Sequence, residues 1–425
     1  MFRAMLLIFP IASFLAPPPI QLPKAAEHGK SFNNLISALE TSMFNFSQTQ
    51  QKIKDFFDTA AVDLERKMAG MFEQFKLEFE KKFSPEEEEK RFKIFGQNMR
   101  HVWQHNKLPK IMYQMGINEF SHLTDSEFKS QYLQQSLPLK LNEPGTAPPV
   151  TLGSAVPQET NPSDLLTGSG RLLGSKKLGS RARSLQSSNL SPEAQKLLSE
   201  IPPKLDWTLK GKITPVKHQR TCQGCYVFSA IAALESAAAI RYNVTMQMAE
   251  QEIIDCSFSF KNGGCVGGQP EFVYDYIIAN GINLQSNYPF IAKEGQCKAP
   301  TFKGVFKKLT KFFKPEPNVL SILQYLQYGP VVVNHYVPDD FKYYFQGIFA
   351  TSDCYHQTTI NHSAIIVGYD LDTPNPFFRL KNSWGLKWGE SGFYKVLIGD
   401  LTKENPGFCF LANNGYNAFP TLFDV

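Results

Sequence analysis

Cysteine placement is the feature that most restricts how this chain can fold. All seven cysteines follow residue 220, and none lies in the first half of the 425-residue sequence. An odd number of cysteines in a secreted chain is typical of disulfides together with one free thiol. Three disulfides and one reactive cysteine would account for all seven, but counting alone leaves open which one is free. The cysteines are Cys222, Cys225, Cys256, Cys265, Cys297, Cys354 and Cys409.

The N-terminal residues favour a secretory route. Residues 1–16 contain one early arginine and then a short apolar run, which is typical of a signal peptide. A buried or mobile N-terminal segment is the alternative. Four Asn-x-Ser/Thr sequons fit the same route, with a lysosome, an acidic vacuole or the extracellular space as the destination. The sequons begin at Asn45, Asn189, Asn243 and Asn361.

Length and charge narrow the protein class. The length of 425 residues suggests two or three folded parts, and the hydrophobic fraction of 42% is ordinary for a globular protein with a core. The net charge of +5 is mild, so it favours neither a nucleic acid nor a membrane surface as the partner. No apolar run reaches the roughly 18 residues that a membrane-spanning helix needs.

Residues 27–131 are predicted to form an α-helical region. Phe72, Phe75 and Phe79 recur at helical spacing, and Ser84-Pro85 starts another helix whose first turn is acidic. Taken alone, this pattern predicts a helical hairpin that supports another domain. Six residues follow one side of the second helix at intervals of four, four, three, four and four. They are Glu87, Arg91, Phe95, Asn98, Val102 and Asn106.

The remaining sequence divides into a linker and a second folded part. Residues 132–200 are rich in Pro, Gly, Ser and Leu and show no helix or strand period, which predicts a flexible linker. Its basic run 171–183 is either a solvated charge run or a proteolytic processing site. From 201 to 425, helical patterns precede strand patterns. This order predicts an α+β fold with two segregated halves and a cleft between them.

The stretch 219–235 contains the candidate nucleophile. It begins as a glycine-containing turn and becomes an apolar, alanine-rich run, which predicts a loop that leads into a buried helix. Cys225 would lie in the first turn, where unpaired backbone N–H groups and the helix dipole lower the pKa of a thiol. The alternative is that Cys222 and Cys225 are ordinary disulfide partners or core residues.

A thiolate nucleophile needs a base, a group that orients the base, and donors for the oxyanion. His362 opens one strand pattern and Asn382 ends the next, so adjacent strands would bring the two side chains together. Trp384 would shield their hydrogen bond from water, and the Gln219 amide would join the cysteine N–H in an oxyanion hole. Two competing bases do not open a strand pattern that leads directly to Asn382. They are His335 and His356.

These patterns together resemble the papain-like cysteine proteases. The helix pattern that starts at Glu87 is similar to the interrupted Glu-Arg-Phe-Asn-Ile-Asn motif of their propeptides, with Val102 in the Ile position. The segment 116–122 resembles the Gly-Asn-Phe-Asp motif of the same propeptides, except that His122 replaces the Asp. Residues 201–425 resemble the catalytic domain, and the propeptide-like part spans 72–128.

The resemblance implies a two-lobed papain-like domain, with a helical lobe, a β-barrel-like lobe and a cleft, preceded by an α-helical propeptide that inhibits it intramolecularly. Cys225 would be the nucleophile, His362 its ion-pair partner, Asn382 the orienting group and Gln219 the oxyanion donor. The enzyme would be a monomer that cleaves proteins or peptides without a cofactor or metal. The implied disulfides, which leave Cys225 free, are Cys222–Cys265, Cys256–Cys297 and Cys354–Cys409.

The resemblance also implies substrate contacts. Gly267 and Gly268 resemble the segment whose backbone pairs with an extended substrate, and Trp384 matches a tryptophan beside the catalytic Asn. Gln223 falls where a small residue normally borders the site for P1, the residue before the cleaved bond. Three amides would make the P2 pocket more polar and weaken any preference for bulky apolar P2 residues. They are Asn334, Asn361 and Asn414.

Two further departures bear on activity and activation. No insertion with paired histidines lies between Cys256 and Cys297, so we expect an endopeptidase rather than a dipeptidase. His122 would gain charge as the pH falls through about 6.5, where the family has a carboxylate. Acid-triggered release of the propeptide is therefore expected to follow a different proton linkage in this chain.

Other functions are weighed against this interpretation. A disulfide oxidoreductase could use Cys222-x-x-Cys225, but no βαβ pattern precedes the motif, and a Cys222–Cys265 bond would exclude it. A protease-like binding protein that has lost activity is a second alternative, although every catalytic position is filled. A metal site is disfavoured because the sequence has no second Cys-x-x-Cys and no His-x-x-x-His.

Overall fold

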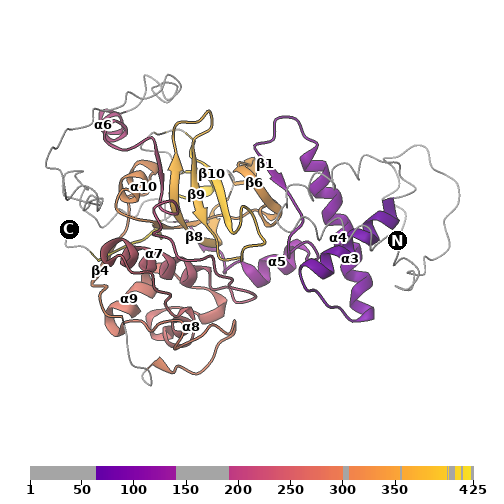
Figure 1. Cartoon of the computed structure of the whole chain (residues 1–425), viewed down its shortest axis with the longest axis horizontal. Coiled ribbons are helices and arrows are strands. Elements are labelled where there is room, and N and C mark those ends of the chain that lie inside the picture. Colours follow the sequence, from indigo (N-terminus) through magenta and orange to yellow (C-terminus); the bar gives the residue numbers. More distant parts are fainter. Residues whose placement is uncertain are drawn as a thin grey trace, which may run out of the picture. The chain divides into compact units, whose positions relative to one another are not determined.

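The computed structural model describes residues 64–139, 191–299, 306–354, 357–399, 401, 407–412 and 415–422. These residues belong to one compact unit of the chain, Thr59–Val425 (Figure 1). We call residues 64–139 the N-terminal part and residues 201–422 the C-terminal part. The predicted signal peptide, most of the linker and the residues Asn45, Asn189, His356 and Asn414 lie outside the described residues.

The described N-terminal part is mainly helical, as predicted. Its core lies between the first two helices, where the Phe72 ring centroid is 5.5 Å from that of Phe92 and 5.3 Å from that of Phe95. This packing of aromatic rings holds the part together without cysteines. The elements are α3 (Leu64–Glu78), α4 (Pro85–Asn106), β1 (Tyr113–Met115), α5 (Asp125–Tyr132) and β2 (Leu137–Pro138).

Local capping fixes where these helices begin. The Ser84 hydroxyl accepts a hydrogen bond from the Glu87 N–H at 3.3 Å, and Pro85 takes the first helical position of α4, where no N–H is needed. At α5, Thr124 and Glu127 form a reciprocal capping box.

The polar members of the six-residue pattern on α4 tie the following segment to the helix. The Asn98 amide donates to two backbone carbonyls of the segment 121–123, at 2.9 Å each, and Arg91 donates to the same segment at 3.2 Å. Phe95 is fully buried. The six residues therefore lie on one face of α4, which packs against the core and also makes these hydrogen bonds.

The C-terminal part has a helical half and a sheet half, which confirms the predicted α+β class. The helical half comprises α7 (Cys225–Tyr242), α8 (Glu250–Cys256) and α9 (Pro270–Asn280), and α10 (Val319–Leu326) follows. The strands are β3 (Lys204–Asp206), β4 (Lys311–Phe313), β5 (Val331–His335), β6 (Tyr344–Phe349), β7 (Thr359–Ile360), β8 (His362–Asp370), β9 (Phe377–Lys381), β10 (Phe393–Leu397) and β11 (Phe419–Thr421).

The main sheet brings the two parts of the chain together. Its order is β1-β6-β10-β9-β8-β3, with β5 also paired to β8. The strand β1 comes from the N-terminal part and pairs antiparallel with β6. Because β8 and β9 are antiparallel neighbours, the start of β8 lies beside the end of β9. In Figure 1 these strands stand next to α7, which packs against β8.

The helix α7 is buried along nearly its whole length. Its alanines and apolar side chains contact α8, α9, β5 and β8, so the helix forms the centre of the main core cluster. It begins at Cys225 after Gly224, and no side chain caps it. This burial explains why the stretch is apolar on all sides rather than amphipathic.

The structure differs from the predicted linker at both ends. Residues 132–139 complete α5 and form β2, and Pro192–Glu200 form the helix α6. The Ser191 hydroxyl caps α6 by accepting from the Ala194 N–H at 3.2 Å. The sequence 191–193 is Ser-Pro-Glu, the same start signal as at residue 84, so this helix could have been found. Among the described helices, none is long and apolar enough to cross a bilayer.

Candidate active site

Cys225 is the free cysteine among the described residues. It is fully buried at the first position of α7, and Gly224 leaves the helix N-terminus without a side-chain cap. Its sulfur therefore lies at the end of the helix where backbone N–H groups favour an anion.

The thiol nevertheless differs from the low-pKa group expected from the sequence. Burial raises the pKa of Cys225 to about 12, and backbone groups of Ser363, Tyr226 and Gln134 offset part of that rise. Gln134 belongs to the N-terminal part, so a backbone group of that part lies beside the Cys225 sulfur. With the site covered in this way, Cys225 is a neutral thiol rather than a thiolate.

His362 and Asn382 meet as the strand order predicts. The His362 Nε2 and the Asn382 Oδ1 are 2.9 Å apart, and both residues are buried. The indole of Trp384 lies against the imidazole, with ring centroids 4.7 Å apart. Trp384 is itself fully buried, so water has no access to the hydrogen bond from that side.

The hydrogen bond fixes the imidazole tautomer. A carbonyl oxygen such as Asn382 Oδ1 can only accept, so Nε2 of His362 carries the hydrogen and Nδ1 carries a lone pair. Nδ1 is buried and makes no hydrogen bond to any described residue. Burial, with a further contribution from His335, lowers the pKa of His362 to about 3. The imidazole is therefore a neutral base, not yet ion-paired with Cys225.

Gln219 is held at the same site. Its Oε1 accepts from the Ser383 hydroxyl at 2.6 Å, and its backbone N–H donates to the Ser383 carbonyl at 2.8 Å. The side-chain Nε2 donates to the Tyr132 carbonyl at 3.0 Å and to the Cys222 carbonyl at 3.1 Å. The Tyr132 carbonyl of the N-terminal part thus accepts a hydrogen bond from the Gln219 amide, which would otherwise be available to stabilise an oxyanion.

Residues 130–139 of the N-terminal part pass through this site. The Gln134 N–H donates to the Asn361 carbonyl at 3.1 Å, and the Leu139 N–H donates to the Thr358 carbonyl at 3.0 Å. Between these bonds, β2 pairs antiparallel with β7. An extended peptide that adds a strand to a sheet edge binds in the same manner. The segment therefore excludes a peptide substrate from the cleft.

The preceding residues anchor the segment beside Trp384. The rings of Phe120 and Phe128 contact Trp384 edge-on, with centroids 5.5 and 5.3 Å away. The Asn118 amide donates to the Lys342 carbonyl at 2.6 Å, and the buried Lys342 ammonium pairs with Asp125. Aromatic packing and polar contacts thus fix the N-terminal part to one end of the cleft.

The glycines assigned to substrate binding have different surroundings. A Cβ on Gly267 would lie 3.1 Å from the Gln134 Cβ, and its φ of +129° favours glycine. A Cβ on Gly268 would lie 2.5 Å from the Tyr226 ring. Gly267 therefore borders the cleft directly, whereas Gly268 packs against Tyr226. The Gln223 amide also reaches the N-terminal part and donates to the Ser130 carbonyl at 2.5 Å.

Two of the three amides assigned to the P2 pocket lie among the described residues. The Asn334 amide donates to the Tyr416 carbonyl at 2.9 Å, and the residue is 1% exposed. The Asn361 amide accepts from the Val337 N–H at 2.8 Å and donates to the Val337 carbonyl at 3.1 Å. Both amides are engaged with backbone groups of the C-terminal part. Burial also makes the sequon at Asn361 inaccessible in the folded chain.

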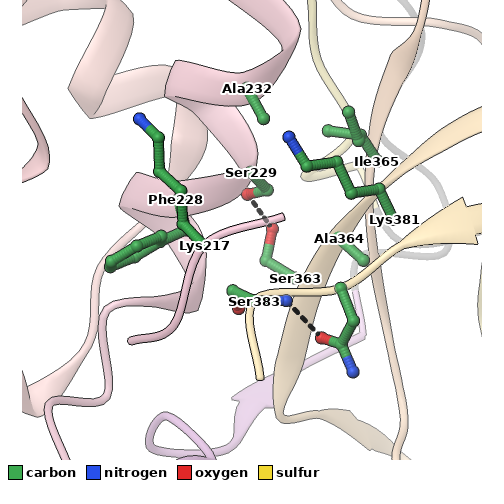
Figure 2. A pocket seen from close by; sticks show the side chains of 10 residues that line it. Lys217, Phe228, Ser229, Ala232, Ser363, Ala364, Ile365, Lys381 and Ser383 are labelled. Atoms are coloured by element: carbon green, nitrogen blue, oxygen red, sulfur yellow. Dashed lines mark hydrogen bonds between the residues drawn. The ribbon is translucent and has the colours of Figure 1, made fainter. Parts of the chain in front are cut away.

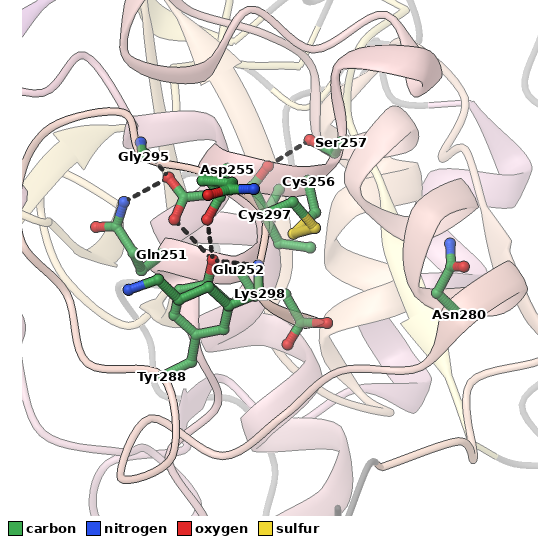
Figure 3. Close-up of a disulfide and its surroundings, with 12 residues drawn as sticks. Gln251, Glu252, Asp255, Cys256, Ser257, Asn280, Tyr288, Gly295, Cys297 and Lys298 are labelled. Carbon is green, nitrogen blue, oxygen red and sulfur yellow. Dashed lines mark hydrogen bonds between the residues drawn. A yellow bond between two sulfur atoms is a disulfide. The ribbon is translucent and has the colours of Figure 1, made fainter. Parts of the chain in front are cut away.

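Three disulfides join the remaining cysteines in the pairs that the resemblance implies. Because Cys222 is bonded to Cys265, a Cys222–Cys225 redox disulfide is excluded. Figure 3 shows the Cys256–Cys297 bond at the C-terminal end of α8, where the Asp255 carboxylate accepts from the Tyr288 hydroxyl and the Gly295 N–H, each at 2.8 Å. The pairs are Cys222–Cys265, Cys256–Cys297 and Cys354–Cys409.

A small cavity lies between the helical and sheet halves beside Asn382 (Figure 2). The Ser229 and Ser363 hydroxyls in its lining are 2.7 Å apart. Its volume of about 20 Å³ suits a single water molecule and is too small for a substrate.

His335 is excluded as the catalytic base by its hydrogen bonds. Its Nε2 lies 2.8 Å from the Tyr394 hydroxyl, and its Nδ1 lies 3.1 Å from the Tyr336 carbonyl. Both ring nitrogens are thus engaged within the C-terminal part. Burial lowers the pKa of His335 to about 4, so the ring is neutral. The His335 ring lies edge-on to the His362 ring, with ring centroids 5.6 Å apart.

Two family models match these parts of the chain. The papain family cysteine protease matches residues 201–415, and the cathepsin propeptide inhibitor domain matches residues 72–128. The fold and the site thus define a cysteine protease preceded by an inhibitory domain. The chain belongs to the papain family of cysteine proteases.

Known relatives resemble both parts. Fruit bromelain of Ananas comosus is 28% identical over 84% of this chain and 87% of its own length. Pro-cathepsin H of Bos taurus is 30% identical over 76% of this chain and 84% of its own length. Among solved structures, a recombinant stem bromelain precursor matches with a TM-score of 0.64 at 26% identity, and the match covers 84% of this chain and 99% of that one.

Proposed function

We propose that this protein is a monomeric cysteine endopeptidase of the secretory pathway, with Cys225 as its nucleophile. It is made as a zymogen and cleaves protein or peptide substrates in a lysosome, an acidic vacuole or the extracellular space. The observation that carries this proposal is the path of residues 130–139 through the site. A chain segment already lies where a peptide would bind, with the Tyr132 carbonyl on Gln219.

The geometry supports a defined sequence of proton and acyl transfers once this segment leaves. His362 takes the thiol proton at Nδ1 while Asn382 holds the imidazole at Nε2. The thiolate of Cys225 attacks the peptide carbonyl, and the Gln219 amide and the cysteine N–H stabilise the oxyanion. His362 then protonates the leaving amine, and water that it deprotonates hydrolyses the thioester.

Removal of the N-terminal part also supplies the conditions for this chemistry. The same burial that raises the pKa of Cys225 lowers that of His362, so the covered site keeps both groups neutral. Contact with solvent reduces the cost of charge on both groups. The thiolate–imidazolium pair is thus a property of the opened site rather than of the zymogen.

The open path through the cleft supports internal cleavage. The segment lies beside Trp384 at one end, passes Cys225 and pairs with β7 at the other end. A protein chain could extend beyond the site in both directions. An exopeptidase instead closes one end of its cleft.

Active-site labelling tests this proposal. The acid-matured protein is treated with a thiol-directed epoxide, and the modified residue is mapped by mass spectrometry, with Cys225→Ala as the control. We expect a single label on Cys225, cleavage of internal bonds in a denatured protein, and a loss of turnover of at least about 100-fold in Gln219→Ala. A label elsewhere, or release of terminal residues alone, would overturn the assignment.

A further inference from the structure

The loop before Gln219 holds a carboxylate of the N-terminal part. The Nε2 of His218 lies 2.8 Å from one oxygen of Glu119 and 2.9 Å from the other. Its Nδ1 accepts a hydrogen bond from the Arg220 N–H at 2.9 Å. Nε2 therefore carries the hydrogen that faces the carboxylate, and it does so in the neutral imidazole.

The C-terminal part alone positions this donor. The backbone of His218 forms an isolated antiparallel β-bridge with that of Trp384. A Cβ on Gly385 would lie only 2.9 Å from the His218 Cδ2, so the imidazole packs against the Gly385 backbone. The Gly385 N–H donates to the Lys217 carbonyl at 3.1 Å. None of these contacts involves Glu119, so departure of the N-terminal part would leave the N–H aimed at the same place.

Charge at this end of the cleft is complementary to an acidic peptide. Arg220 is exposed in the same loop, with a φ of +52°. Lys387, on the turn after Trp384, donates to the Glu78 carbonyl and lies over the Phe79 ring at 5.4 Å. The C-terminal part thus carries Arg220 in the same loop as His218, and Glu119 is 15% exposed where it contacts His218.

The path of residues 130–139 places this site relative to the cleaved bond. Gly267 and β7 lie on one side of Cys225, and under the proposed peptidase function the part of a substrate that precedes the bond would bind there. Trp384 and His218 lie at the other end, next to Gln219. They therefore face the residues that follow the bond, on the leaving-group side.

We propose that His218 is a specificity-determining residue that selects peptide substrates with Asp or Glu on the leaving-group side of the cleaved bond. Glu119 occupies this carboxylate site in the zymogen and vacates it on maturation. The selection rests on the proposed peptidase function. A hydrogen bond to a charged group at a half-buried position supports about a tenfold preference for Glu over its uncharged analogue.

Matched fluorogenic peptides test this selection. Pairs that differ only by Glu or Gln at P1′, P2′ or P3′ are cleaved by the mature enzyme, and the ratio of kcat/KM within each pair is measured. We expect a ratio of about ten at one position. Ratios near one at all three positions would overturn the proposal without any variant, while cleavage of the Gln peptides would still report the peptidase itself.

Three variants assign the preference to a residue. His218→Phe keeps an aromatic ring on Gly385 but has no donor, so the Glu/Gln ratio should fall to about one. His218→Gln restores an N–H donor and should recover part of the ratio. In Arg220→Gly most of the ratio should persist. If the ratio survives in His218→Phe, or disappears in Arg220→Gly, the assignment to His218 is wrong.

Discussion

The N-terminal and C-terminal parts both bury ionisable side chains, and acid acts with opposite signs on Glu250 of the C-terminal part and on His122 of the N-terminal part. In the C-terminal part, Lys217 lies 2.7 Å from Glu235 and 2.5 Å from Glu250. Burial raises the pKa of Glu250 to about 7; the Lys217 charge opposes this rise and the Glu235 charge adds to it. A carboxyl group with a raised folded-state pKa binds its proton more readily when folded, so acid favours the folded form.

His122 in the N-terminal part shows the opposite linkage. Its ring lies 5.5 Å from that of Phe75 and 5.4 Å from that of Phe83. Burial, followed by the charges of Lys81 and Arg91, lowers the pKa of His122 to about 3. The expectation that folded His122 gains charge near pH 6.5 is therefore wrong. Only the unfolded chain binds that proton, so stability is lost as the pH falls from about 6.5 towards 3.

We expect the two parts to differ in their resistance to acid. The C-terminal part has three disulfides and a buried cluster that tolerates protonation. Both parts contain buried histidines with a lowered pKa, which are His122 in the N-terminal part and His335 and His362 in the C-terminal part. The N-terminal part, however, has no cysteine and therefore no disulfide that would oppose its unfolding. A fall in pH would thus unfold the inhibitory part first and uncover the cleft.

The largest effect is expected where the N-terminal part buries a charge. Arg91 pairs with Glu127 at 2.7 Å and with Glu87 at 2.8 Å, and its side chain is 11% exposed. We predict that Arg91→Met destabilises the N-terminal part by about 3 kcal/mol, because it leaves the partner carboxylates without their cation. Urea unfolding of a Cys225→Ala zymogen at pH 7 measures the change.

An exposed pair on the same helix is the matched control. Lys93 and Glu89 are 2.6 Å apart, but their side chains are 69% and 68% exposed. Lys93→Met should cost less than about 0.5 kcal/mol. Equal losses of unfolding free energy in Arg91→Met and Lys93→Met would show that burial of the Arg91 ion pairs adds nothing to stability. Buried charge would then not explain how the N-terminal part responds to acid.

His122→Phe is the next strongest test, because it removes the titrating group and keeps a ring in the aromatic site. With a pKa near 3 when folded and 6.5 when unfolded, His122 should cost the zymogen up to about 2.7 kcal/mol between pH 6.5 and 4.5. The variant should lose that part of the pH dependence and mature only at lower pH. Unfolding free energies at both pH values, in the Cys225→Ala background, measure it.

His101 is a control of opposite sign. Its hydrogen bond to Asp340 at 2.6 Å raises the pKa of His101, although burial opposes the shift. Its contribution is therefore fully present below pH 6.5 and is lost as the pH rises through the raised value. His101→Asn should weaken the zymogen more in acid than at neutral pH. If His122→Phe and His101→Asn changed the pH dependence in the same direction, the assigned linkage would be falsified.

Sequence patterns predict those features that depend on local order. The apolar run after Gly224 predicts α7, and the strand patterns that start at His362 and end before Asn382 predict that the two side chains meet. The capping signal at Ser84 predicts the start of α4. Each of these inferences needs only a period, a cap or the adjacency of consecutive strands.

Features that depend on distant partners are not visible in the sequence. The strands β1 and β2 have only three and two residues, too few to show a strand period, and their partners β6 and β7 lie more than two hundred residues away. The backbone groups that bond to the Asn334 and Asn361 amides likewise become known only from the folded chain. The pKa of His122 likewise depends on Phe75, Phe83 and Lys81, which pack around it only in the folded chain.

The smallest effect is expected from Gln223, one of two glutamines, with Gln219, that bond to residues 130–139. Gln219 is fully buried and bonds to Ser383 as well as to Tyr132, whereas the Gln223 amide donates to the Ser130 carbonyl near the surface. Gln223→Gly should remove about 1 kcal/mol of zymogen stabilisation, which would speed acid-triggered maturation about fivefold. Gln223→Glu should speed it further, because a carboxylate would face the Ser130 carbonyl. The rate of maturation at fixed acid pH, followed by gel and by labelling of Cys225, is the measurement. Unchanged rates in both variants would show that the N-terminal part holds the cleft without this hydrogen bond, through Gln219, β7 and the aromatic contacts with Trp384.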